Sequence, residues 1–161
     1  MKRVFSQTFC VVGAILEKDG KFLLVKEAKN TSDKGKWNQP AGWLDVGEIP
    51  LAAVKREVQE EAGYDFTPTH ILGVYSIVRR DLAKAGEEIR HPVKIIFRGV
   101  ISGEQSPKLA DDISETHWFA PEEIEQMDKK ILRDLDIKKM IKDYLSDKKY
   151  PLELISHTIS E

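Results

Sequence analysis

The chain has a single cysteine and almost no net charge, and each shortage excludes a class of protein. Cys10 stands alone inside an apolar run, residues 9–12, so neither an intramolecular disulfide nor a multi-cysteine zinc site can form. We expect it to be a buried core thiol. The 25 lysines and arginines are offset by 27 aspartates and glutamates, which leaves a formal charge of −2. This balance argues against a general surface for nucleic acid or anionic membranes.

Long apolar runs are also missing. No stretch approaches the length that crosses a membrane, and the basic residues 1–3 lead into polar residues rather than into a signal-peptide core. We therefore expect a cytoplasmic protein, monomer or homodimer, with no nucleic-acid or membrane partner. The 161 residues are 41% hydrophobic, which suits one ordinary domain. With no repeat or linker to divide it, the chain is expected to be a single domain over residues 1–161.

The first part of the chain predicts strands. Residues 8–16 and 22–25 are β-branched or apolar, and the Asp19–Gly20 pair between them is a strong hairpin signal. Two antiparallel strands are the expectation. Residues 30–36 are polar and indicate a loop, and residues 37–47, with a proline and two glycines, continue it as an irregular stretch.

Helices and strands then alternate. Residues 49–62 predict an amphipathic helix that begins with Pro50 and stops at Gly63. Further strands are expected at residues 71–78, 93–101 and 116–119, the first two joined by the polar residues 81–90. A short helix starts at Pro121, and a long amphipathic one is indicated by apolar residues at helical spacing: Ile131, Leu132, Leu135, Met140, Ile141, Tyr144 and Leu145. The fold class is α/β (α+β), an α-β-α sandwich around a mixed, mainly antiparallel sheet.

Three glutamates cluster on the helix of residues 49–62. At about 100° per residue, Glu57, Glu60 and Glu61 fall on one side of it and repel one another. A hard divalent ion such as magnesium, which prefers oxygen ligands and fills its shell with water and phosphate, would relieve that repulsion. The alternative is a solvated acidic face paired with Lys55 and Arg56.

The residues around the cluster favour the metal interpretation. Gly42, Glu48, Arg56, Glu57, Glu60, Glu61 and Gly63 follow the order Gly-x5-Glu-x7-Arg-Glu-x2-Glu-Glu-x-Gly. This pattern resembles the Nudix box, position for position, and the box occupies a loop, a helix and a loop as expected here. Tyr64 departs from the aliphatic residue that usually follows, at a packing position.

The resemblance implies an activity and a set of roles. Nudix hydrolases use a divalent metal, usually Mg²⁺ with Mn²⁺ as a possible substitute, and a water attacks phosphorus in a nucleoside diphosphate linked to another group. Carried over, Glu57, Glu60 and Glu61 would be metal ligands together with the carbonyl of Ala41. Glu57 would also be the best candidate base. Glu48 and Arg56 would form a supporting pair that holds the ligands in register.

A second resemblance concerns the substrate. Residues 36–42 and 150–155 are similar to small Nudix phosphatases of the NudJ type, which implies a nucleoside di- or triphosphate or a related small pyrophosphate. Nucleoside diphosphate sugars are the alternative substrates, and a non-catalytic nucleotide-binding module is the alternative function. The proline typical of ADP-ribose hydrolases is absent near Arg79 and Arg80, which counts against that specificity.

Several other residues are candidate substrate contacts. Trp37 and Trp43 could stack a base, although both are equally suited to packing. Lys34 and Lys36 could meet a terminal phosphate as point charges. Basic residues at strand ends are further phosphate candidates, and two loop acids could add to the metal site: Arg79, Arg80, Lys94, Asp112 and Glu115.

Overall fold

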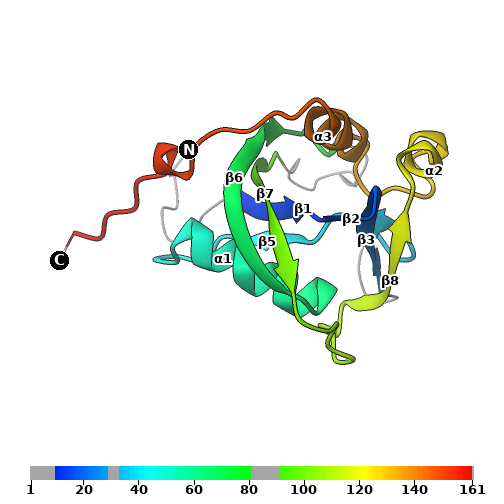
Figure 1. Cartoon of the computed structure of the whole chain (residues 1–161), viewed down its shortest axis with the longest axis horizontal. Helices are drawn as coiled ribbons and strands as arrows, with labels where there is room; N and C mark the ends of the chain where they lie inside the picture. The colour runs from blue at the N-terminus through cyan, green and yellow to red at the C-terminus, as the bar shows by residue number, and fades with distance from the viewer. Residues whose placement is uncertain (1–9, 29–32, 81–90, 161) are drawn as a thin grey trace.

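The computed structural model describes residues 10–28, 33–80 and 91–160. Two four-stranded sheets form its centre (Figure 1). The first has the order β5-β1-β7-β6, built from β1 (Cys10–Ile15), β5 (Ala41–Trp43), β6 (Asp65–Ser76) and β7 (Val93–Ser102). In it β1 runs parallel to β7, whereas the β1–β5 and β6–β7 pairs are antiparallel. The expected mixed, mainly antiparallel arrangement is confirmed.

The second sheet is centred on β3 (Lys21–Glu27). It pairs antiparallel with β2 (Glu17–Lys18), β4 (Trp37–Asn38) and β8 (Ile113–Phe119). Asp19 and Gly20 both have positive φ, 53° and 77°, as the predicted tight hairpin turn requires. The strand before that turn differs from expectation, because β1 pairs with β5 and β7 and only β2 returns along β3.

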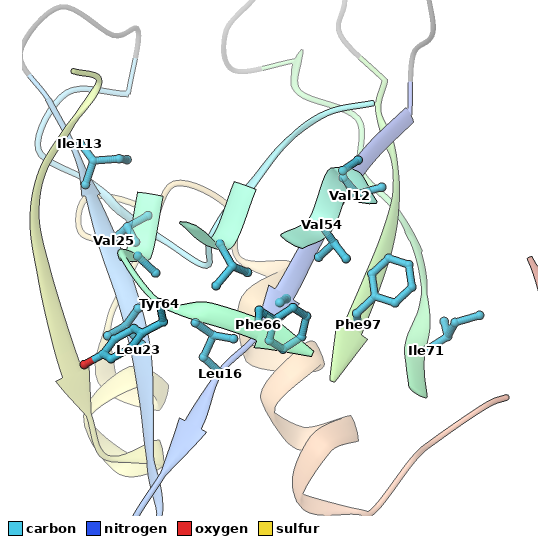
Figure 2. Close-up of a cluster of buried hydrophobic side chains, with 14 residues drawn as sticks. Val12, Leu16, Leu23, Val25, Val54, Tyr64, Phe66, Ile71, Phe97 and Ile113 are labelled. Carbon is cyan, nitrogen blue, oxygen red and sulfur yellow. The ribbon is translucent and has the colours of Figure 1, made fainter. Parts of the chain in front are cut away.

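Side chains that point alternately to the two faces of the strands divide the hydrophobic core into two clusters. On β3, Leu23 and Val25 face one cluster, whereas Phe22 and Leu24 face the other. Successive strand residues point to opposite faces, so both faces of the sheets need a cover. Figure 2 shows the first cluster, in which Val54 and Tyr64 join the strand residues.

Helices supply the two covers. On one side α1 (Pro50–Glu57) continues as a π-helix, η1 (Val58–Ala62), and contributes Ala53, Val54, Val58 and Ala62 to the first cluster. On the other side α2 (Pro121–Gln126) and α3 (Asp136–Leu145) contribute Ile124, Ile137, Met140 and Ile141 to the second. Figure 1 shows α1 and α3 on opposite sides of the strands. The α-β-α sandwich is thus confirmed. A short 3-10 turn, η3 (Leu152–Leu154), follows near the C-terminus.

Several element boundaries differ from the predicted ones. The last long helix is shorter than expected because the backbone of residues 131–133 bonds to Trp37: Trp37 N–H donates to the Ile131 carbonyl, and Arg133 N–H donates to the Trp37 carbonyl, both at 2.8 Å. Leu132 is nevertheless buried, so its apolar character reflects packing outside a helix. The strands β6 and β8 begin earlier than predicted, since each gains partners on its neighbouring strand.

Cys10 is half-buried at the first position of β1, so the expectation of a fully buried thiol was wrong. The predictions for residues 8–9, 30–32 and 81–90 lie outside the described residues. No helix among the described residues is long and apolar enough to cross a membrane.

Candidate active site

The change from α- to π-helix shapes the acidic end of α1. Pro50 starts the helix, where its missing N–H is harmless. At the other end Gly63 N–H donates to both the Val58 and the Gln59 carbonyls at 3.1 Å, and Gly63 takes a left-handed φ of 75°. Glu60 and Glu61 therefore lie on a wider turn than an ideal α-helix gives, a feature common at functional sites.

Glu57 lies directly against β5. Its carboxyl group fills the space beside Gly42, so that a Cβ at position 42 would come within 2.3 Å of the carboxyl carbon and both oxygens. Glu57 is buried, and burial raises its pKa, opposed by hydrogen bonding and charge attraction from Arg56. Glycine at position 42 is thus what allows this carboxylate to approach the strand.

Glu61 is anchored to the same strand. The Ala41 N–H donates to its Oε2 at 2.8 Å. Burial raises the pKa of Glu61 well above the ordinary value; the Ala41 hydrogen bond opposes this, and the negative charges of Glu57, Glu27 and Asp112 add to it. The side chain sits in a region of uncompensated negative potential, which favours either a proton or a cation.

Arg56 connects these acids to the preceding loop. Its guanidinium binds both oxygens of Glu48, contacts Glu57 Oε1 at 2.6 Å through Nη1, and reaches Glu60 Oε2 at 3.3 Å. Glu60 remains half exposed. The hydrogen bonds from Arg56 lower the pKa of Glu48. The structure thus brings Glu48, Arg56, Glu57 and Glu60 into one charged network.

The donor chemistry of this network fits a hard cation. Among the described residues no group of three or more acidic, histidine or cysteine side chains already has the arrangement of a metal site. Arg56 donates to Glu57 Oε1, and the Ala41 N–H donates to Glu61 Oε2. The carboxylates still border one cavity, and carboxylate oxygens are the ligands that Mg²⁺ prefers.

That cavity measures about 420 Å³, within the range of small-molecule sites. Many predicted site residues line it: Ala41, Trp43, Arg56, Glu57, Glu60, Glu61 and Arg79. Asp112 and Lys94 line it as well. Glu48 does not line the cavity itself but binds Arg56, which does.

Other candidates are not among the residues that line the cavity. Trp37 packs edge-on against Phe119, with ring centroids 4.9 Å apart. Lys34 and Arg80 are exposed, and Lys36 Nζ lies 3.5 Å from Asp33 Oδ1. Glu115 pairs with Lys26 at 3.1 Å.

Sequence reasoning missed one wall of the cavity. It comprises charged and amide side chains from separate segments: Glu27, Asp33, Asn38, Gln39, Arg133 and Asp134. The polar pair Asn38–Gln39 within an otherwise apolar strand region was the one signal for them, because a strand that buries amides implies a partner or a ligand. The ion pairs join residues far apart in sequence and leave no local pattern.

A mixed sheet between helices, with a helix that presents carboxylates to a cavity, defines the class: an α/β sandwich with an acidic small-molecule site. Comparison with known proteins narrows this class. The NUDIX domain family model matches residues 7–143. An ADP-ribose pyrophosphatase of Methanocaldococcus jannaschii is 35% identical over 144 residues, 89% of this chain and 76% of that protein. Phosphatase NudJ of Escherichia coli is 32% identical over 147 residues, 89% of this chain and 88% of the relative.

The fold of this chain is similar to that of a solved NUDIX hydrolase. A NUDIX hydrolase from Nitrosomonas europaea superimposes with a TM-score of 0.80 at 32% identity, covering 92% of this chain and 96% of that one. The chain belongs to the Nudix family and is a Nudix hydrolase.

Proposed function

We propose that this hydrolase cleaves a diphosphate linkage in nucleoside di- or triphosphates, or in related small pyrophosphates, by attack of water at phosphorus. The observation that carries the proposal is the edge of the cavity where Glu57, Glu60 and Glu61 meet the guanidinium of Arg56. The family generally uses divalent metal ions. A polyanionic substrate at an acidic edge needs such an ion to offset repulsion.

Mg²⁺ would be held by Glu57, Glu60, Glu61 and the carbonyl of Ala41, with Mn²⁺ as a substitute. When bound, the ion lowers the pKa of a coordinated water and neutralises charge on the phosphate oxygens. Glu57 is the proposed base. Arg56 Nη1 lies 2.6 Å from Glu57 Oε1 and fixes the orientation of this carboxylate.

Trp43 is the proposed stacking residue for the ring of the substrate. Its side chain is about half exposed and lines the cavity. Stacking on an aromatic side chain tolerates several ring types. Lys34, Lys36, Trp37 and Arg80 have no contact with the cavity in the structure to support a direct role.

Nucleoside diphosphate sugars are the second candidate substrates. The name of the Methanocaldococcus jannaschii relative, an ADP-ribose pyrophosphatase, favours them, whereas that of the Escherichia coli relative, phosphatase NudJ, favours the first candidate. A non-catalytic module is disfavoured because the chain keeps all three glutamates.

A substrate panel with Mg²⁺ tests the proposal. Nucleoside triphosphates, diphosphates and ADP-ribose are assayed with separate detection of phosphate, pyrophosphate and nucleoside monophosphate. We expect turnover of nucleoside di- or triphosphates that stops with chelator and returns with Mg²⁺ or Mn²⁺. Cleavage of ADP-ribose alone would favour the second candidate. Nucleotide binding without cleavage of any anhydride would establish the binding module.

A further inference from the structure

Arg133 brings a further cation to the wall of the cavity. It follows the buried Leu132 in the segment between α2 and α3. Two backbone hydrogen bonds of 2.8 Å, from Trp37 N–H to the Ile131 carbonyl and from Arg133 N–H to the Trp37 carbonyl, hold this segment beside β4. Because the backbone is fixed on both sides of Leu132, the side chain of Arg133 extends into the cavity from a rigid position.

The guanidinium of Arg133 is held along one edge. Nη1 donates to Glu27 Oε1 at 2.6 Å, and Nε lies 3.3 Å from Asp33 Oδ2. Among the described residues nothing accepts a hydrogen bond from Nη2, which is not one of the buried unpaired atoms either. The side chain as a whole is 31% exposed. Nη2 is therefore a donor on the accessible side of the guanidinium, and the two carboxylates fix its orientation.

The other cations that line the cavity differ from Arg133 in their exposure or in their partners. Arg79 and Lys94 have side chains that are only 6% and 3% exposed, and both bind Asp134 at 2.6 Å. All three guanidinium nitrogens of Arg56 already donate hydrogen bonds. Within the part of the chain that the structure describes, Arg133 is thus the cavity cation that combines exposure with a nitrogen that has no partner.

Arg133 and the proposed metal ligands border the same cavity. Glu27, the partner of Arg133, is close enough to Glu61 for its negative charge to raise the pKa of that residue. The cavity therefore has a carboxylate edge that suits a divalent ion and, next to it, a guanidinium that suits an anion. Guanidinium groups bind phosphate oxygens through charge-assisted hydrogen bonds and stay charged at any ordinary pH.

We propose that Arg133 binds a phosphate of the substrate through Nη2, next to the phosphate that lies at the glutamates. The substrate is then held at two successive phosphates, while Nη1 stays paired with Glu27. An unesterified phosphate carries more charge than one esterified by a sugar, so Arg133 favours nucleoside diphosphates over nucleoside diphosphate sugars. This inference rests on the proposed function, since it assigns the second phosphate of the same substrate.

Two nucleotides that differ by one phosphate test the inference without catalysis. AMP lacks the second phosphate, whereas α,β-methylene-ADP carries it on a bridge that resists hydrolysis. Calorimetry with Mg²⁺ measures α,β-methylene-ADP directly and AMP by competition. Arg133→Ala should weaken binding of α,β-methylene-ADP about tenfold, because a charge-assisted hydrogen bond is lost, and should change binding of AMP less than about twofold. An equal loss for both nucleotides, or no loss for either, would overturn the inference.

Two further variants complete the experiment. Lys130→Ala removes an exposed cation three positions away and should leave both affinities unchanged. Arg133→Lys keeps a positive charge beside Glu27 but has a single nitrogen, so it should weaken α,β-methylene-ADP about fivefold and spare AMP. If Arg133→Ala does not fold, the lysine variant decides: wild-type affinity for α,β-methylene-ADP in Arg133→Lys would refute the assignment.

Steady-state kinetics test the preference between substrates. Arg133→Ala should raise KM for ADP more than KM for ADP-ribose, in which the second phosphate is esterified. An equal rise would remove the selective role of Arg133.

The proposed function and this inference fail in different ways. A loss of affinity confined to α,β-methylene-ADP, with no cleavage of any anhydride by the wild type, supports the role of Arg133 and refutes the proposed function. Cleavage of nucleotides by the wild type, with unchanged affinity for α,β-methylene-ADP in Arg133→Ala, supports the proposed function and refutes the role of Arg133.

Discussion

The guanidinium of Arg56 binds both carboxylate oxygens of Glu48, with Nε 2.8 Å from Oε1 and Nη2 2.9 Å from Oε2. Its third nitrogen contacts Glu57 at 2.6 Å. One side chain thus ties the loop before α1 to a proposed metal ligand. Bidentate pairing fixes geometry as well as adding energy, so Arg56 should matter for both stability and activity.

Replacing Arg56 by alanine should reduce both the stability and the activity of the protein. The variant leaves Glu48 and Glu57 without their partner. After allowance for its partial exposure we expect a loss of about 1–2 kcal/mol in the free energy of unfolding. Turnover should fall about 100-fold because Glu57 loses its orientation. Thermal melts and steady-state kinetics measure the two effects. Lys55→Ala, next to it and exposed, is the matched control. A melt equal to that of wild type would make Arg56 a surface charge.

Glu57→Gln and Glu61→Gln should each lower turnover by about 10²–10⁴-fold at saturating Mg²⁺. Near wild-type turnover in either variant would remove that residue from the proposed site.

The stability of the Glu57→Gln and Glu61→Gln variants should not fall. Because the pKa of Glu61 is raised in the folded protein, its ionisation opposes folding above the unfolded pKa near 4.3. In chelator, Glu61→Gln should therefore melt at or above the wild-type temperature at pH 7, and the gain should shrink as the pH falls toward 4. A gain that grew on acidification would contradict the sign of this pKa shift.

Gly42→Ala should separate activity from stability. The new Cβ would overlap the carboxyl group of Glu57, the far end of a flexible side chain that can swing away. We expect turnover to fall about 100-fold with a small change in melting temperature. Gly13→Ala is the contrasting variant, because its Cβ would lie 2.8 Å from the Pro40 carbonyl oxygen and 2.6 Å from Ala41 Cβ. That clash involves backbone, so Gly13→Ala should lose stability first.

Asp143 should make stability depend on acid pH. Burial raises its pKa, but hydrogen bonds from Lys139, Lys148 and Tyr75 outweigh this and lower it below the usual value. A carboxyl group with a lowered folded pKa stabilises the protein above its unfolded pKa and loses that contribution as pH falls through the folded value. Asp143→Asn should cost about 1–2 kcal/mol at pH 7.

The difference between Asp143→Asn and wild type should narrow below about pH 4. Melting temperatures across pH 3–7 provide the measurement, with the exposed Asp111→Asn as control. A difference that stayed constant down to pH 3 would show that the charge of Asp143 contributes nothing.

Local sequence predicted the acidic helix well. Pro50 and Gly63 bound the helical segment as expected, and the spacing of Glu57, Glu60 and Glu61 placed them at one edge of the cavity. The departure is the π-helix at Val58–Ala62. The spacing of apolar residues alone is compatible with both helix types, and the choice between them depends on how the helix end meets its neighbours.

The sequence by itself determined the features that depend on near neighbours. The Asp19–Gly20 turn, the alternation on β3 and the order of residues around Arg56 follow from backbone preferences and short spacings. These were enough to indicate the sandwich and the acidic edge of the cavity.

Only the tertiary structure decided the ion pairs of Arg79, which lie in the wall of the cavity. The pair of Arg79 with Asp134 joins residues 55 positions apart, and Arg79 with Asp33 spans 46. The backbone of residues 131–133 forms hydrogen bonds with Trp37 in place of the predicted helix. Such contacts are long-range, and their formation depends on which segments packing brings together. Local backbone preferences do not depend on which segments meet in the fold. The sequence therefore predicted Arg79 as a phosphate ligand, whereas in the structure it pairs with Asp33 and Asp134.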